Sequence, residues 1–145
     1  MNSSANNPDV KQAVPFFMVK NMDSSLQFYI EGLGFELANK WEPEGRIEWC
    51  WLQIGGASLM LQEYRANIPA IKLGEGVSVC FMCGDALAVY KQITINGLSA
   101  SLEPFVGNNL WVVGLTDPDG YNIFFESPTE APEGTTYSEW IKTVL

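Results

Sequence analysis

The side chains that carry out most acid–base and metal chemistry in proteins are sparse in this chain. It contains no histidine, which removes the commonest transition-metal ligand and every Ser–His or Cys–His catalytic pair. Cys80 and Cys83 have the C-x-x-C spacing, but the flanking residues predict a strand, where residues three apart point to opposite faces. We therefore expect these thiols and Cys50 to be free and structural, which suits a reducing, cytoplasmic compartment.

The charge of the chain excludes some partners. Eight Lys plus Arg against 17 Asp plus Glu give a net charge of −9. An acidic surface repels phosphate backbones and anionic lipid, so we expect neither nucleic acid nor membrane as a partner. It would attract a cationic small molecule, although acidity serves solubility equally well. No apolar run approaches the ~20 residues of a membrane span, and the first residues do not resemble a secretory signal.

The pattern of apolar residues and turn signals predicts the same series of elements twice. Each half of the chain contains a strand, a helix and three further strands. In the first half these elements are expected at 14–19, 22–32, 35–41, 47–54 and 57–64. In the second half they are expected at 77–83, 86–95, 98–104, 110–116 and 121–126, and a short helix follows at 138–144.

A shift of 64 residues superposes the two halves. It places Phe17 on Phe81 and the helix cap Asn21 on Asp85, with a one-residue slip near Gly34. Because caps, helix ends and turns recur together, the sequence predicts an α+β fold of two tandem βαβββ repeats in one globular domain. The boundaries that we expect are an arm at 1–12, units at 13–67 and 76–128 joined by a linker at 68–75, and a tail at 129–145.

Two segments carry a resemblance to a known family. Residues 19–35 contain Phe-Tyr followed by Leu-Gly-Phe, and residues 116–126 contain Asp-Pro-Asp-Gly and a closing strand. They resemble the opening and closing motifs of the glyoxalase/bleomycin-resistance/extradiol-dioxygenase superfamily, also called the vicinal oxygen chelate fold. The likeness covers about residues 13–128. It implies curved mixed sheets around a cleft.

The resemblance also implies where a metal would be held. Enzymes of the family bind a divalent metal through His, Glu or Gln on the first and last strand of each unit. The matching positions here hold Val14, Met60, Ser78 and Phe124. None of these offers an imidazole or an anionic oxygen. We therefore expect no metal and no other cofactor, and the interpretation leans away from an enzyme.

Alternation along the strands predicts which side chains face such a cleft. They are mostly apolar and soft, which suits a ligand with hydrophobic or aromatic parts, and Glu126 could fix a cationic group. The same side chains could instead meet and fill a core, and each tryptophan could serve sheet packing or a dimer contact. The predicted ligand-binding residues are Phe16, Met18, Trp49, Trp51, Met60, Gln62, Ser78, Met82, Trp111, Asn122, Phe124 and Glu126.

Two functions remain open at this point. The first is a metal-free protein that sequesters a hydrophobic or cationic aromatic molecule, such as an antibiotic, at a homodimer interface, as the bleomycin-resistance branch of the family does. The second is a metal-dependent or metal-free enzyme of the same superfamily, a lyase, isomerase or dioxygenase. A metal-free enzyme could use Glu126 or Glu48 as a general base if burial raised the pKa of that carboxyl. The sequence does not tell whether the repeats pair within one chain or swap between two chains.

Overall fold

The computed structural model describes residues 8–64 and 73–144. Within them the strands form two four-stranded sheets, with strand orders β1-β4-β3-β2 and β5-β8-β7-β6. The first sheet contains β1 (Phe16–Val19), β2 (Glu36–Trp41), β3 (Trp49–Ile54) and β4 (Ala57–Glu63). The second contains β5 (Ser78–Met82), β6 (Phe105–Gly107), β7 (Leu110–Thr116) and β8 (Asn122–Pro128). The predicted α+β fold of two βαβββ units is confirmed.

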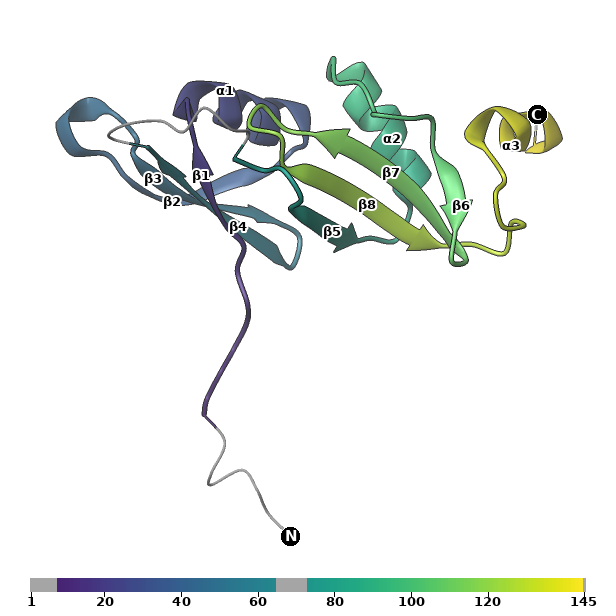
Figure 1. Cartoon of the computed structure of the whole chain (residues 1–145), viewed down its shortest axis with the longest axis horizontal. Coiled ribbons are helices and arrows are strands. Elements are labelled where there is room, and N and C mark those ends of the chain that lie inside the picture. Colours follow the sequence, from purple (N-terminus) through teal and green to yellow (C-terminus); the bar gives the residue numbers. More distant parts are fainter. Residues whose placement is uncertain (1–7, 65–72, 145) are drawn as a thin grey trace, which may run out of the picture.

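The helices follow the first strand of each sheet. In the first unit α1 (Met22–Leu26) continues directly into the π-helical turn η2 (Gln27–Gly32), and a short 3₁₀ turn, η3 (Pro43–Gly45), follows β2. In the second unit α2 (Ala86–Ile95) stands alone. Figure 1 shows that these helices lie on the same side of the two sheets, and that α3 (Tyr137–Val144) lies beyond β6. The opposite face of both sheets carries no helix among the described residues.

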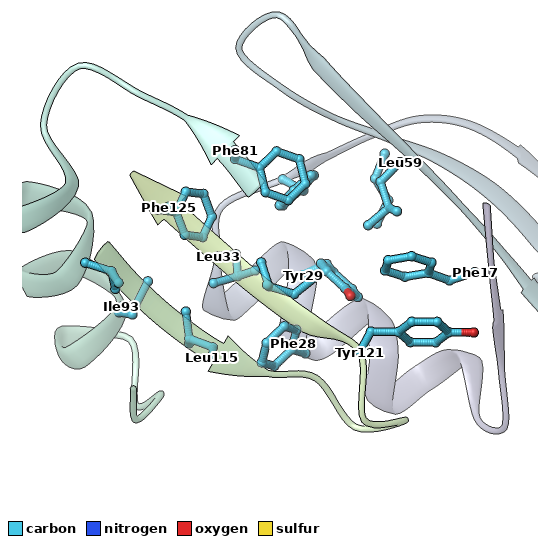
Figure 2. Close-up of a cluster of buried hydrophobic side chains, with 14 of the residues drawn as sticks. Phe17, Phe28, Tyr29, Leu33, Leu59, Phe81, Ile93, Leu115, Tyr121 and Phe125 are labelled. Carbon is cyan, nitrogen blue, oxygen red and sulfur yellow. The ribbon is translucent and has the colours of Figure 1, made fainter. Parts of the chain in front are cut away.

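One hydrophobic core runs through both repeats, between the sheets and their helices. The rings of Phe17 and Tyr121 stack with centroids 3.8 Å apart, and Phe35 meets Phe81 edge to face at 5.5 Å. Each of these pairs joins one repeat to the other, and Figure 2 shows the first pair, with the rings of Phe17 and Tyr121 facing each other. Because the apolar surface of each unit is covered partly by the other, we expect the two units to fold together.

The hydrogen bonds that start the helices confirm the repeat of 64 residues. The carboxylate of Glu63 accepts the backbone N–H of Met22 at 2.7 Å, and the hydroxyl of Ser127 accepts that of Ala86 at 2.8 Å. The corresponding donors, Met22 and Ala86, are 64 positions apart, and so are the acceptors Glu63 and Ser127. The cap residues Asn21 and Asp85 likewise accept from the backbone N–H three residues on, at 3.0 and 3.1 Å. Each helix therefore begins on the same two contacts.

The strand expected at 98–104 is wrong. The second unit instead forms its edge strand β6 at Phe105–Gly107, after Pro104, which has no N–H to donate to a ladder. The turn from β6 to β7 is made by Asn108 and Asn109, both with positive φ (54° and 64°), as a two-residue hairpin turn requires. Residues 1–7 of the expected arm and 68–72 of the expected linker lie outside the described residues.

Candidate functional site

The two sheets present a row of outward-facing side chains on the side that the helices do not cover. Along β4 the residues Leu59 and Leu61 are fully buried, whereas the intervening Met60 is half-buried. Its neighbour on β3 is Trp51, and the next pair along is Trp49 with Gln62. We call this surface, formed by the alternate residues of both sheets, the open face. All predicted ligand-binding residues except Trp111 lie on it.

The open face is apolar although it is exposed. Phe16 on β1 and Met82 on β5 leave 53% and 61% of their surface accessible. Parallel pairing sets Phe16 beside Met60 and Met82 beside Glu126. An aromatic ring thus lies beside a thioether in the first sheet, and a thioether lies beside a carboxylate in the second. These groups suit a ligand with an apolar body and a cationic group.

Trp111 does not belong to this surface, so its prediction needs correction. It is 5% exposed on β7 and meets Trp140 of α3 with ring centroids 5.8 Å apart. On the open face of the second sheet, Gly114 pairs with Phe124. In the first sheet Trp51 holds the matching position, opposite Met60. Equivalent residues of β3 and β7 are therefore 63 positions apart, whereas those of β4 and β8 are 64 apart.

The reason for this change of register is the length of a turn. In the first sheet, two residues separate the paired ends of β3 and β4, Ile54 and Ala57. In the second sheet, three residues separate Asp117, which follows β7, from Tyr121, which precedes β8. The backbone N–H of Asp117 donates to the carbonyl of Tyr121 at 2.9 Å. The extra residue restores the shift of 64 in the last strand. A slip of one residue moves a strand side chain to the other face, and Trp111 therefore points into the helix-covered core.

A recess of about 180 Å³ opens beside Phe124 in the second sheet. Its formation depends on Gly114, because a Cβ there would lie 2.8 Å from the Phe124 ring. The predicted residue Asn122 lines it together with Phe105 and Glu103, which the sequence analysis missed. Glu103 belongs to the strand expected at 98–104, which the structure does not form, and Phe105 follows that segment directly, so neither was among the strand positions predicted to face the cleft.

A second cavity, of about 560 Å³, lies where the repeats meet. It is bounded by the β3–β4 turn of the first unit, at Gly55 and Gly56, and by Met82 and Cys83 of the second unit. Met82 is the only predicted ligand-binding residue among the residues that line it. Most of its lining belongs to the helix-covered side, including Phe81, Phe125 and Val89 of α2, so this cavity is distinct from the open face.

Hydrogen bonds fix some of the polar groups on the open face. The amide oxygen of Gln53 accepts the indole N–H of Trp51 at 3.2 Å and the hydroxyl of Ser58 at 2.7 Å. The amide of Asn122 donates to the carbonyl of Val77 at 3.3 Å. Trp51 is thus held in one orientation by its own strand, which favours a preformed aromatic surface.

The positions that hold the metal in enzymes of this fold do not fit one here. Met60 and Phe124 lie on the open face, and neither offers an oxygen or nitrogen donor. Among residues 8–64 and 73–144 no three Cys, Asp or Glu side chains lie close enough together to hold a metal ion. The two carboxylates considered as a general base lie in different repeats and on different faces. Glu48 is two residues before the buried Cys50 and so points to the same side as Cys50, whereas Glu126 lies on the open face of the second sheet.

The strongest electrostatic feature lies in the interior, between the repeats. Asp117, which is 4% exposed, accepts the hydroxyl of Tyr29 at 2.6 Å and the backbone N–H groups of Asp119 and Tyr121 at 2.9 Å. Burial nevertheless raises the pKa of Asp117 above its usual value and that of Tyr29 well above its own. The carboxylate of Asp119 accepts the backbone N–H of Lys20 at 3.1 Å, so this turn joins the second repeat to the first.

The described part of the chain contains no helix that is both long and apolar enough to span a bilayer. The chain was also compared with known proteins. No significant match exists among curated protein sequences. Many solved structures, in contrast, share its fold.

Two of the similar structures illustrate the likeness. TnmS3, described as an antibiotic binding protein from Streptomyces sp. CB03234, has 21% identity and a TM-score of 0.65, with 85% of this chain and 100% of that chain covered. TioX from Micromonospora sp. ML1 has 16% identity and a TM-score of 0.66, with 82% and 99% covered. At these identities the likeness is one of fold.

A third structure, a glyoxalase/bleomycin resistance protein/dioxygenase from Nocardioides, has 14% identity and a TM-score of 0.63, with 89% and 91% of the two chains covered. The family model for the glyoxalase, bleomycin resistance protein and dioxygenase superfamily matches residues 11–125. The resemblance of the two sequence motifs is therefore confirmed over most of the chain. This protein belongs to the Glyoxalase/Bleomycin resistance protein/Dioxygenase superfamily.

Proposed function

We propose that this protein is a metal-free binding protein for a hydrophobic or cationic aromatic small molecule, of the kind that includes antibiotics. The observation that carries the proposal is the apolar open face, where the exposed Phe16 pairs with Met60 and the exposed Met82 pairs with Glu126. Contiguous exposed apolar surface is rare unless it binds something. The fold of TnmS3, described as an antibiotic binding protein, supports this direction.

Charge favours a cationic ligand within that class. The net charge of −9 draws cations toward the surface, and Glu126 supplies a carboxylate on the open face itself. The same charge makes nucleic acid a poor partner. The three cysteines are free, which is typical of proteins that act in the reducing cytoplasm.

The arrangement of the open face further supports a homodimer. Two sheets of one chain leave the same apolar face uncovered, and a second copy has surface of matching character to place against it. Ligand held between two such faces would lose most of its contact with water. In this proposal the ligand therefore binds at the dimer interface.

Fluorescence quenching with a matched pair of dyes tests the proposal. We expect saturable quenching by the cationic planar dye ethidium and much weaker quenching by the anionic aromatic dye 8-anilinonaphthalene sulfonate. Trp51→Phe should remove a large part of the signal. Trp140→Phe, the control, should preserve the affinity, because Trp140 of α3 packs on Trp111 away from the open face. Absence of saturable quenching by either dye, with a folded protein by circular dichroism, would refute the proposal.

The contribution of Glu126 is separable. Glu126→Gln keeps the size of the side chain and removes its charge. We expect weaker ethidium binding by about tenfold or less, as one exposed charge contributes roughly 1 kcal/mol. Unchanged ethidium affinity in this variant would remove Glu126 from the site.

A further inference from the structure

The open face carries a thiol, that of Cys80, which the proposed function does not use and which lies beside the thioether of Met82. Cys80 and Met82 are two residues apart on β5 and therefore point to the same side of the strand. The thiol sulfur of Cys80 lies 3.6 Å from the thioether sulfur of Met82. Both residues are exposed, so an ion in solution can reach the pair.

The chemistry of this pair differs from that of the metal positions known for the fold. Thiolate and thioether sulfur are soft ligands, and soft ligands select Cu(I) over the hard divalent cations that prefer carboxylate and carbonyl oxygen. A strand holds both side chains at a fixed spacing, which lowers the entropy lost when they bind one ion. We propose that Cys80 and Met82 form a binding site for a soft monovalent cation of the Cu(I) class.

The neighbouring strand supports this assignment. Glu126 pairs with Met82 across the β5–β8 ladder, and its carboxylate is close enough to Cys80 to act on the thiol electrostatically. Negative charge beside the sulfur pair favours the arrival of a cation. Binding of Cu(I) by this pair releases one proton from Cys80 into solvent, because the thiolate is the ligand.

The other two cysteines provide controls within the same chain. Cys83 follows on the opposite face, where its sulfur lies 3.5 Å from the carbonyl of Glu126. Cys50 is fully buried. A thiol that binds Cu(I) without regard to its surroundings would do so at Cys83 as well as at Cys80.

Competition with the chelator bicinchoninate measures the binding. Under anaerobic conditions we expect the full chain to withdraw a single Cu(I) from the chelator complex. Cys80→Ser should lower the affinity at least about tenfold, as expected for loss of a ligand, and Met82→Leu, which preserves size, should lower it as well. Cys83→Ser should bind like the original protein. Unchanged binding by Cys80→Ser, or equal losses in Cys80→Ser and Cys83→Ser, would overturn the site.

A second measurement reports on the thioether directly. With methyl-labelled methionine and Ag(I) as a redox-inert probe, the methyl resonance of Met82 should shift, whereas that of the buried Met22 should not. An unmoved Met82 resonance at saturating Ag(I) would exclude the sulfur pair. These readouts contain no organic ligand, so their failure would leave the proposed dye binding untouched, and loss of dye binding would leave them untouched.

Discussion

The two repeats share the contacts that build them and differ in the surface they expose. Both helices begin on a backbone N–H held by the last strand of their unit, from Glu63 in the first and Ser127 in the second. On the open face the first sheet sets a tryptophan, Trp51, against Met60. The second sets Gly114 against Phe124 and gains a recess there. The two repeats thus have the same helix-start contacts but different side chains on the open face.

This difference indicates that the two sheets would contribute unlike halves to a site. The first offers a large aromatic surface that Gln53 holds in place. The second offers a hollow of about 180 Å³ beside Phe124. A planar ligand could stack on one half and insert an apolar group into the other. If the open faces of two chains only packed against each other, a flat aromatic surface in one sheet and a recess in the other would not be needed.

Truncation of equivalent core residues has the largest expected effect. Leu59 and Ile123 occupy matching strand positions, and both are fully buried. Leu59→Ala and Ile123→Ala should each destabilise the fold by about 2–5 kcal/mol, since both leave a cavity in one shared core. Urea unfolding followed by fluorescence and circular dichroism should show one coincident transition. Two separate transitions would show that the repeats unfold independently.

Removal of the helix-start contacts should affect the repeats unequally. Glu63 is 6% exposed and bonds both Met22 and the guanidinium of Arg46. Glu63→Ala should cost about 2 kcal/mol, because the buried Met22 N–H loses a charged acceptor, whereas the exposed guanidinium of Arg46 regains water. Ser127→Ala should cost only about 1 kcal/mol. Equal losses in chemical denaturation would contradict this difference between the repeats.

Filling the recess should test its role with a smaller effect on stability. Gly114→Val places side-chain atoms where the Phe124 ring lies, at a cost of about 1–3 kcal/mol for displaced packing. Ethidium affinity should fall together with stability. Val112→Ala, at the neighbouring open-face position, is the control, and it should enlarge the recess and preserve binding. Full affinity in Gly114→Val would show that the ligand does not use the second sheet.

The smallest expected effect is a pH dependence that comes from the contact between repeats. Burial raises the pKa values of Asp117 and Asp119 above the usual 3.8. A raised pKa in the folded state means that the protonated form is favoured by folding, so this contribution to stability is present below about pH 4 and is lost as pH rises through the folded pKa. Asp117→Asn should flatten the decline of the urea midpoint between acidic and neutral pH.

The sequence predicted the features that depend on neighbouring residues. Alternation along each strand separated Leu59 and Leu61 from Met60, and the structure has the same separation. The cap residues Asn21 and Asp85 were visible from their type and position, and both bond as expected. These signals are local, because a residue's side of a strand and its place at a helix start are fixed by the chain adjacent to it.

The tertiary structure decided what depends on distant segments. Trp111 left the open face because a turn farther along the chain is one residue longer in the second repeat. The bond between Tyr29 and Asp117 joins residues 88 positions apart, and no pattern within either segment announces it. The recess needs Gly114, Phe124 and an edge segment to meet in space. Composition and periodicity fix which way a side chain turns on its own element, whereas only packing fixes what it meets there.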